Sequence, residues 1–341
     1  RGMASSLIVP VTTIDSIAPH PGADRLEIAR VLGWQVVVPK GRYTTGDKVV
    51  YFPPDAIVPA EHSDRFGVTQ YLQKGRVKCA RLRGEPSYGF LAAPDDATVP
   101  VGTNLAAHYG VIKYEPPVRV DAGDAEVDDP LFPRYTDIEN FRNFPDALRN
   151  DEPIVLTEKV HGTNCRVGIV RGQRMAGSMR LRRKEPAAED LARNTYWLPF
   201  SLPPVAALLE HFARNHQQVV LYGEVYGRGI QSFHYGRRSE PGFAVFDLLV
   251  SGRFLDWEEL QAALQQFGAP GAPVLYEGPF ALAVVRAHAD GKTTYGDDHI
   301  REGVVIRPRH ERTDPRIGRV VLKYIGDAYL LDEKKSDFTE S

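Results

Sequence analysis

The chain has 341 residues, a formal net charge of −2 and two cysteines. This length allows two domains with separate cores, and the near balance of charge excludes a wholly basic nucleic-acid-binding protein, so any nucleic-acid surface is expected as a local patch. Cys79 and Cys165 form neither a CxxC pair nor a zinc-ligand cluster, which favours a reducing, cytoplasmic environment. No run of about eighteen apolar residues occurs, so no membrane span is expected.

From Leu7 to Leu91, short strand-like runs alternate with turn residues. The predicted strands are 7–17, 26–32, 34–38, 48–52 and 77–82, and residues 63–73 are predicted to be helical. Short strands at this density favour a small closed barrel that the helix plugs.

Positive charges gather on one strand-like segment of this region, namely Arg76, Lys78, Arg81 and Arg83. A solvated edge strand explains them equally simply. The functional alternative is contact with nucleic-acid phosphates, with Tyr71 or Tyr88 stacking on a base.

Residues 101–133 are acidic, contain several prolines and show little periodicity, which is typical of a linker. We place the boundary near residue 120, with a first domain plus linker over residues 3–120 and a second domain over 121–341. In the second domain, helical patterns at 186–193 and 203–215 alternate with apolar strand-like runs, which predicts an α+β domain.

The second domain contains the sequence Glu158-Lys159-Val160-His161-Gly162-Thr163-Asn164, between apolar runs at 153–156 and 165–170. A lysine is thus expected at a strand end, just before a tight turn. Using such a lysine as a nucleophile at pH 7 costs about 4–5 kcal/mol for deprotonation, which burial or a nearby cation can lower. An exposed lysine before a β-turn remains an alternative on these residues alone.

Four later strand-like runs carry chemically useful side chains: Glu224 in 219–227, Phe246 in 242–249, Glu302 in 299–308 and Lys323 in 319–325. Each charge alone is more often structural than catalytic. In this order, however, they are the parts needed to hold a nucleoside triphosphate against a lysine.

With these motifs assembled, residues 135–331 resemble the covalent nucleotidyltransferases, and within them the RNA ligases of the phage RNA ligase 2 branch. Lys159 to Asn164 are similar to that branch's KxxG motif, and 223–231, 243–247, 302–305 and 322–324 are similar to its later motifs. Residues 17–26 and 46–50 resemble the OB-fold domains attached to some tRNA-binding proteins. An OB domain in front gives a layout similar to bacterial nick-sealing RNA ligases.

The resemblance implies an OB-fold barrel followed by an adenylyltransferase domain built on antiparallel sheets with flanking helices. It implies ATP-dependent sealing of 3′-OH/5′-phosphate breaks, with nicked duplexes containing RNA as partner and a monomeric enzyme. Lys159 would be the nucleophile and Lys323 a phosphate contact. His161, Gly162 and Asn164 would line the nucleotide site.

For the remaining positions, the resemblance implies that Glu224 accepts hydrogen bonds from ribose and that Phe246 stacks on adenine. Glu302, together with Glu224, would bind Mg²⁺ or Mn²⁺. Arg180 is the expected motif Ia arginine, with Arg182 as the alternative.

One position departs from the family pattern. Many relatives have a second lysine two residues after Lys323, where this chain has Ile325, and Arg319 is a possible substitute. The competing functions are a DNA ligase or capping-type nucleotidyltransferase and a non-catalytic tRNA- or RNA-binding protein.

Overall fold

In the computed structural model, residues 7–114, 123–231, 233, 235–237, 239–296 and 298–331 are described. Contacts within the chain divide it into two compact units, one made mainly of residues before 117 and one mainly of residues after it. The predicted boundary near residue 120 lies outside the described residues and stays a prediction. Within the described part, no helix is long and apolar enough to span a membrane.

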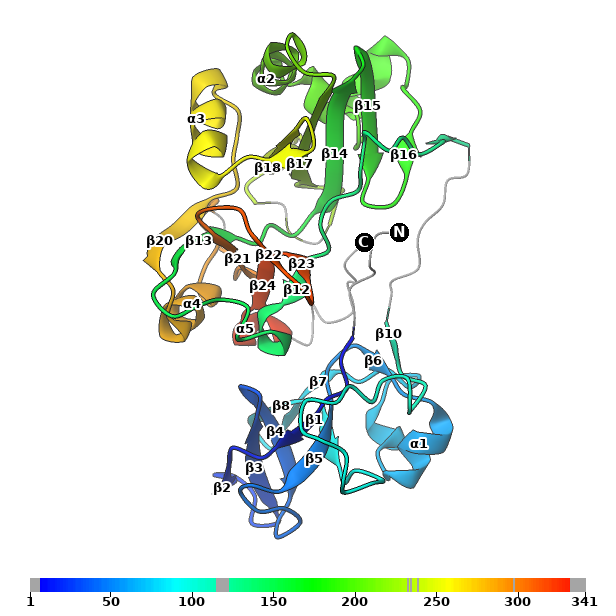
Figure 1. Ribbon diagram of the computed structural model, residues 1–341, viewed down its shortest axis with the longest axis vertical. Helices are drawn as coiled ribbons and strands as arrows, with labels where there is room; N and C mark the ends of the chain where they lie inside the picture. The colour runs from blue at the N-terminus through cyan, green and yellow to red at the C-terminus, as the bar shows by residue number, and fades with distance from the viewer. Residues whose placement is uncertain are drawn as a thin grey trace. The chain divides into compact units, whose positions relative to one another are not determined.

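The first unit is built from short antiparallel strands (Figure 1). One three-stranded sheet has the order β1 (Val11–Thr13), β5 (Lys48–Phe52), β9 (Phe90–Ala92), and another has the order β2 (Ser16–Pro19), β3 (Leu26–Val31), β4 (Trp34–Pro39). Two pairs complete it: β6 (Ala56–Ile57) with β10 (Ile112–Lys113), and β7 (Cys79–Leu82) with β8 (Glu85–Tyr88). Two buried clusters, around Phe52 and around Trp34, form its core.

The predicted helix 63–73 is wrong as one element. The structure has α1 (Ala60–Arg65) followed by a separate 3₁₀ turn, η1 (Thr69–Tyr71). The Ser63 and Thr69 hydroxyl oxygens lie 2.8 Å apart, and the Val68 N–H donates to the Ser63 carbonyl. Hydroxyl side chains that bond locally in this way compete with a continuous helix.

Two sheets organise the second unit. The larger has seven strands in the order β11 (Ala125–Glu126), β16 (Arg182–Arg183), β15 (Gln173–Ser178), β14 (Thr163–Val170), β17 (Gln218–Tyr226), β18 (Gly242–Val250), β19 (Arg253–Phe254). The smaller has five in the order β12 (Glu139–Asn140), β24 (Leu322–Ile325), β21 (Gly303–Pro308), β13 (Pro153–Glu158), β20 (Val274–Pro279). Only the β12–β24 pairing is parallel among the described strands of these sheets, so antiparallel sheets with flanking helices are confirmed.

The remaining elements are short or lie beside the sheets. They are η2 (Phe141–Asn143), η3 (Ala188–Arg193), η4 (Leu198–Ser201), α2 (Pro203–Ala213), α3 (Trp257–Phe267), α4 (Leu282–Ala289), the hairpin β22 (Thr313–Asp314) with β23 (Gly318–Arg319), and α5 (Asp327–Leu330). The predicted helix 186–193 is the 3₁₀ helix η3, which ends before Asn194, where the Asn194 side-chain oxygen accepts the Tyr196 N–H at 3.1 Å.

Helices α2 and α3 cover one face of the seven-stranded sheet (Figure 1). Cys165 and Val167 of β14, with Leu221 and Val225 of β17, face this apolar core. Because side chains alternate along a strand, Asn164 and Glu224 lie on the opposite face. That face, and the connection from β13 to β14, define the place where the chemically useful side chains gather.

Candidate active site

Residues 159–162, the Lys159 loop, connect β13 of the five-stranded sheet to β14 of the seven-stranded sheet. Three of its backbone N–H groups are held by three other segments. The Lys159 N–H donates to the Gly303 carbonyl at 3.0 Å, that of His161 to the Tyr235 hydroxyl at 2.7 Å, and that of Gly162 to Glu224 Oε1 at 3.1 Å. A loop of this kind holds its lysine in a defined position.

Gly162 is required by close packing. A Cβ at this position would lie 2.2 Å from the Val225 carbonyl oxygen, inside any real contact distance. The turn therefore passes directly over β17, and this approach allows Glu224 to accept the Gly162 N–H.

Glu302 joins Lys159 and His161. Its Oε1 accepts a hydrogen bond from Lys159 Nζ at 2.6 Å, and its Oε2 lies 3.2 Å from His161 Nδ1. The Glu302 side chain is 2% exposed and that of Lys159 is 18% exposed, so this ion pair is poorly screened by water.

Because a carboxylate only accepts hydrogen bonds, His161 Nδ1 is the protonated donor in this contact. Its other ring nitrogen, Nε2, is buried and has no hydrogen-bond partner among the described residues. In the neutral ring that nitrogen is an acceptor.

Two strand pairings place further predicted residues around the loop. Asn164 of β14 pairs with Glu224 of β17, and the Asn164 side-chain oxygen is buried without a hydrogen-bond partner in the described part of the chain. Lys323 of β24 pairs with Val305 of β21, three residues beyond Glu302. The sheets thus bring Lys159, His161 and Glu302 into direct contact, with Glu224 bound to the neighbouring Gly162 and with Asn164 and Lys323 on adjoining strands.

Phe246 lies at a β-bulge. Tyr222 pairs with Asp247 and Gly223 pairs with Val245, so Phe246 is the extra residue on β18. Its ring packs on Tyr135, with centroids 4.8 Å apart, and its carbonyl accepts a hydrogen bond from Arg307 at 3.2 Å.

The residue after Phe246 belongs to a buried polar network that the sequence did not reveal. Asp247 accepts hydrogen bonds from the Tyr135 hydroxyl at 2.8 Å and from Arg319, and Glu311 pairs with both Arg307 and Arg319. Arg319 also stacks on Phe254 at 3.6 Å. The Arg319 guanidinium is therefore held by contacts within the fold. These contacts do not support the suggestion that Arg319 replaces the lysine charge that is missing at Ile325. The Ile325 side chain is buried.

The three arginines after β15 have different environments. Arg183 pairs with Asp124, and Arg182 donates to the Val127 carbonyl at 3.1 Å. Arg180 is exposed in the turn between β15 and β16, where its N–H donates to Ser178 Oγ. Neither Arg180 nor Arg182 is tested as a phosphate contact by these environments, and Arg180 stays the preferred prediction because it is the more exposed of the two.

The basic segment of the first unit is not one continuous strand. Arg76 precedes β7 and donates to Asp55 at 3.0 and 2.7 Å, and its guanidinium lies 3.7 Å from the centre of the Tyr114 ring. Arg81 and Arg83 are exposed on the β7–β8 hairpin, and Lys78 is partly buried before it. Tyr88 is 3% exposed and cannot stack on a base, whereas Tyr71 is 72% exposed.

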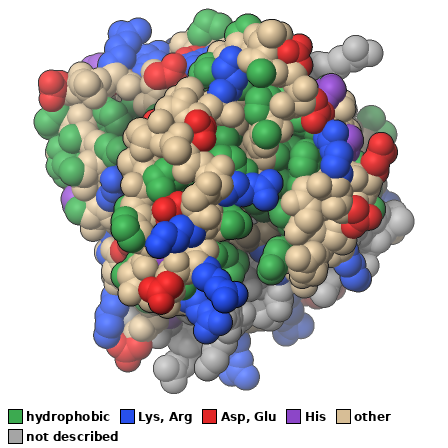
Figure 2. Space-filling view, turned by 90° about the horizontal axis from the view of Figure 1, so that it is seen from below, with side chains coloured by type: hydrophobic (Ala, Val, Ile, Leu, Met, Phe, Trp, Pro, Cys, Tyr) green, Lys and Arg blue, Asp and Glu red, His purple; other side chains and the backbone are tan. Residues whose placement is uncertain are grey.

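Figure 2 shows Lys and Arg side chains singly and in small groups, interspersed with acidic and apolar side chains. This face carries no single continuous basic field, as expected from the net charge of −2.

The carboxylates of the site are suitable ligands for a divalent cation. The described residues contain no ready-made cluster of three or more His, Cys, Asp and Glu side chains. Glu302 and Glu224 nevertheless supply the hard carboxylate oxygens that Mg²⁺ and Mn²⁺ prefer, and Mg²⁺ is commonly held by one or two carboxylates plus substrate phosphates. The residues fit a cation that arrives with a nucleotide.

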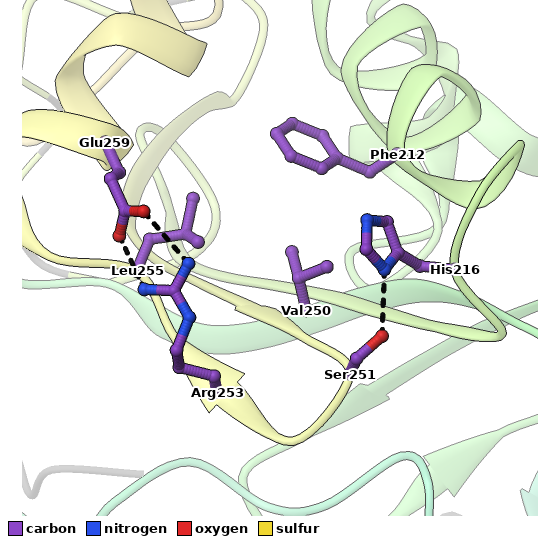
Figure 3. A pocket seen from close by; sticks show the side chains of 7 residues that line it. All are labelled: Phe212, His216, Val250, Ser251, Arg253, Leu255 and Glu259. Atoms are coloured by element: carbon purple, nitrogen blue, oxygen red, sulfur yellow. Dashed lines mark hydrogen bonds and ion pairs between the residues drawn. The ribbon is translucent and has the colours of Figure 1, made fainter.

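A separate hollow of about 420 Å³ lies between α2, α3 and the β18–β19 turn (Figure 3). Its polar side chains satisfy each other: Arg253 pairs with Glu259 at 2.6 and 2.9 Å, and His216 Nδ1 lies 2.9 Å from Ser251 Oγ. None of the predicted site residues lines it.

Sequence reasoning missed Tyr235, although its hydroxyl touches the Lys159 loop. Its segment, between β17 and β18, has no strand or helix periodicity that would predict where the side chain points. Asp247 directly follows the predicted Phe246, but the sequence did not indicate that Tyr135 and Arg319 would be its hydrogen-bond partners.

Comparison with known proteins gave two family matches. A model described as RNA ligase matches residues 152–325, and one described as an OB-fold domain matches residues 8–94. Among curated proteins, the search found no match.

Among solved structures, similar chains are those of Naegleria gruberi RNA ligase. One variant with ATP and manganese is 24% identical, with a TM-score of 0.80 over 97% of this chain and 100% of that one. A variant with AMP and manganese is 25% identical, with a TM-score of 0.79 over 97% and 99%, and the form with pyrophosphate is 24% identical, with a TM-score of 0.78 over 98% and 100%. The expected combination of an OB-fold barrel and an α+β catalytic domain is confirmed.

Proposed function

Because this chain belongs to the RNA ligase family, we propose that it is an ATP-dependent enzyme that seals nicks in duplexes whose 3′-hydroxyl strand is RNA. The observation that carries the proposal is the buried contact of Lys159 with Glu302 at the junction of the two sheets. The Naegleria ligase has been solved with ATP, AMP and pyrophosphate; an adenylylation step would consume ATP and release pyrophosphate, and the sealing step would release AMP.

In the first step, the Lys159 amine would lose a proton and attack the α-phosphorus of ATP. A nitrogen–phosphorus bond forms, the bond to pyrophosphate breaks, and lysyl-AMP results. An ion pair with Glu302 stabilises the ammonium form, so Lys159 must leave this carboxylate before it attacks. A divalent cation bound at Glu302 would disfavour the ammonium form and neutralise phosphate charge.

The second and third steps move the same AMP group. An oxygen of the RNA 5′-phosphate attacks the phosphorus of lysyl-AMP and frees Lys159. The RNA 3′-hydroxyl then attacks the 5′-phosphate and releases AMP. In these steps the protein contributes mainly by positioning the reacting groups and by neutralising their charge.

The remaining residues have proposed roles in binding. Glu224 accepts hydrogen bonds from ribose while its Oε1 holds the Lys159 loop, and Phe246 stacks on adenine from its bulge. Lys323 and Arg180 contact phosphate oxygens. Asn164 Oδ1 and His161 Nε2 are buried acceptors without hydrogen-bond partners among the described residues, and a bound water or a nucleotide hydroxyl could donate to them.

The test of the nucleophile is incubation with α-labelled ATP and Mg²⁺ or Mn²⁺. We expect label on the protein, and none on Lys159→Ala. Lys292→Ala is the matched control, because the Lys292 side chain is 71% exposed and forms a surface ion pair with Asp298. Label that persists in Lys159→Ala excludes Lys159 as the nucleophile.

The substrate assignment is tested with nicked duplexes that carry RNA or DNA on each side of the break and on the opposite strand. We expect sealing to require RNA at the 3′-hydroxyl. Efficient sealing of all-DNA nicks would favour a DNA ligase, transfer of label from GTP would favour a capping-type enzyme, and RNA binding without protein labelling would favour a non-catalytic protein.

For the OB-fold unit, we propose that Arg81 and Arg83 contact duplex phosphates beside the break. Their exposure on the β7–β8 hairpin supports this role. Lys78 stays a weaker candidate, and the ion pair with Asp55 removes Arg76 from the proposed surface.

A further inference from the structure

Tyr235 has an unusual backbone conformation. Its φ of +49° lies in the left-handed region, and Gly236 follows with φ +73°. A bulky L-residue rarely adopts this conformation, because its Cβ crowds the backbone, and such a residue persists only where its surroundings hold it there. The strained residue lies in the segment between β17, which carries Glu224, and β18, which carries Phe246.

Aromatic rings hold the Tyr235 side chain from several sides. The ring is 2% exposed and meets His299 at a centroid distance of 4.6 Å and an angle of 81°. It meets Tyr295 at 5.1 Å and Tyr226 at 5.5 Å, both steeply inclined. Edge-to-face contacts on this scale fix the ring in one orientation.

This orientation aims the hydroxyl at the Lys159 loop. The Tyr235 oxygen accepts the His161 N–H at 2.7 Å, and in sequence this N–H lies between the anchored N–H groups of Lys159 and Gly162. Burial, reinforced by nearby carboxylates including Glu302, raises the pKa of Tyr235 well above its ordinary value, so the hydroxyl stays neutral.

The neighbouring ring supports the same arrangement. Phe233 meets the His161 ring at 5.4 Å and an angle of 64°, and stacks on His299 at 4.0 Å and 8°. The segment therefore holds His161 at both its backbone and its imidazole. If this segment only filled the apolar core, its aromatic rings would be sufficient and the hydrogen bond of the Tyr235 hydroxyl would not be needed.

We infer that Tyr235 is a positioning residue for lysine adenylylation, whose hydroxyl fixes the Lys159 loop so that the amine is held for attack. This role rests on the proposed function. Removing the hydroxyl leaves the buried His161 N–H unpaired, and the loop must shift to hydrate or re-pair it. A small displacement of a nucleophile is enough to slow a reaction that depends on alignment.

The test uses the full-length Tyr235→Phe variant, which keeps the ring and removes the oxygen. We expect the rate constant of lysyl-AMP formation at saturating ATP to fall by about 10- to 100-fold, with the half-saturating ATP concentration changed by less than about threefold. Sealing of a nick that already carries the 5′-adenylate does not use Lys159 as nucleophile, so we expect it to change by less than about threefold.

Tyr295→Phe is the matched control. Tyr295 belongs to the same aromatic cluster, and no hydrogen bond from its hydroxyl to the Lys159 loop is seen among the described residues. We expect its adenylylation rate to stay within about threefold of the parent chain.

Two results overturn the inference: Tyr235→Phe forms lysyl-AMP at the parental rate, or it loses both reactions equally, through unfolding or otherwise, which assigns the residue to packing alone. Melting curves of each variant show whether an equal loss of both reactions comes from unfolding. If the parent chain forms no lysyl-AMP with any nucleotide, the proposed function fails first, and the positioning role fails with it.

Discussion

Glu152 shows how one side chain ties together distant parts of its unit. Its two oxygens accept hydrogen bonds from Arg312 at 2.6 and 2.7 Å, and the Arg149 N–H donates to Oε2 at 3.0 Å. Burial alone would raise the pKa of Glu152, but these hydrogen bonds outweigh it and lower the pKa. The ionised carboxylate is therefore bound more strongly in the folded chain than in the unfolded one.

We predict that Glu152→Gln lowers the melting temperature near pH 7. Charge-assisted hydrogen bonds contribute about 1.5–3 kcal/mol, which corresponds to about 3–10 °C for a unit of this size. Because the folded pKa lies below the unfolded value of about 4.3, the contribution is present above that pH and is lost as the pH falls through the folded pKa.

Melting curves from pH 7 to pH 3 check this expectation. The difference between parent and Glu152→Gln should shrink as the pH falls. Glu210→Gln, at an exposed position, is the control and should show little difference at any pH. A difference that stays constant down to pH 3 would contradict the assignment of the effect to the carboxylate charge.

At this scale, the sequence identified residues whose type and order define a reaction. Lys159, Glu224 and Glu302 could be named because an amine and two carboxylates at strand ends suit adenylyl transfer. Tyr235 and Arg307 could not, since a tyrosine or an arginine has no preferred role until the fold supplies its partner. The pairing of Arg76 with Asp55, which spans 21 residues, could not be predicted for the same reason.

At the scale of elements, β21 and β24 approach each other unusually closely at Gly303. A Cβ there would lie 2.2 Å from the Tyr324 carbonyl oxygen and 2.8 Å from the Ile325 Cα. Both clashing atoms belong to the backbone, so no side chain can move to relieve them. Glu302 and Lys323 flank this contact in sequence: Glu302 immediately precedes β21, and Lys323 lies on β24 next to Tyr324.

We predict that Gly303→Ala separates the two strands, lowers stability by about 1–3 kcal/mol and reduces lysine labelling at least tenfold. Gly123→Ala is the control, because no atom lies within 4 Å of its added Cβ and its φ is outside the left-handed region. Labelling and melting curves of both variants test the expectation. Unchanged labelling in Gly303→Ala would show that the strand spacing is not needed for chemistry.

Long strands with apolar runs could be predicted from sequence, as β14, β17 and β18 illustrate. Their irregularities could not. In β18, Phe243 and Val245 face one core, and so do Leu248 and Val250, because the bulge at Phe246 reverses the alternation between them. No residue-level pattern marks that reversal, which depends on pairing with β17.

At the scale of the whole molecule, the chain divides into a unit for nucleotide chemistry and a unit that we propose grips the duplex. The near-zero net charge was a sound guide, because it excluded a uniformly basic surface.

We predict that the double variant Arg81→Ser with Arg83→Ser binds a nicked duplex more weakly but labels Lys159 normally. If each arginine neutralises one phosphate, the slope of log affinity against log salt should become shallower by about 1.8. Arg65→Ser, which removes an exposed arginine paired with Asp95, is the control. Equal salt slopes in parent and double variant would place the duplex elsewhere.

The long-range contacts of the Lys159 loop have a consequence for how the chain folds. Its contacts with Glu224, Tyr235 and Glu302 join residues 62, 74 and 143 positions apart. Closing loops of that length is entropically costly and slow, so these contacts form after the local hairpins. An intermediate can thus contain most of the strands and still lack an aligned lysine, and competence for adenylylation is acquired only when both sheets have docked.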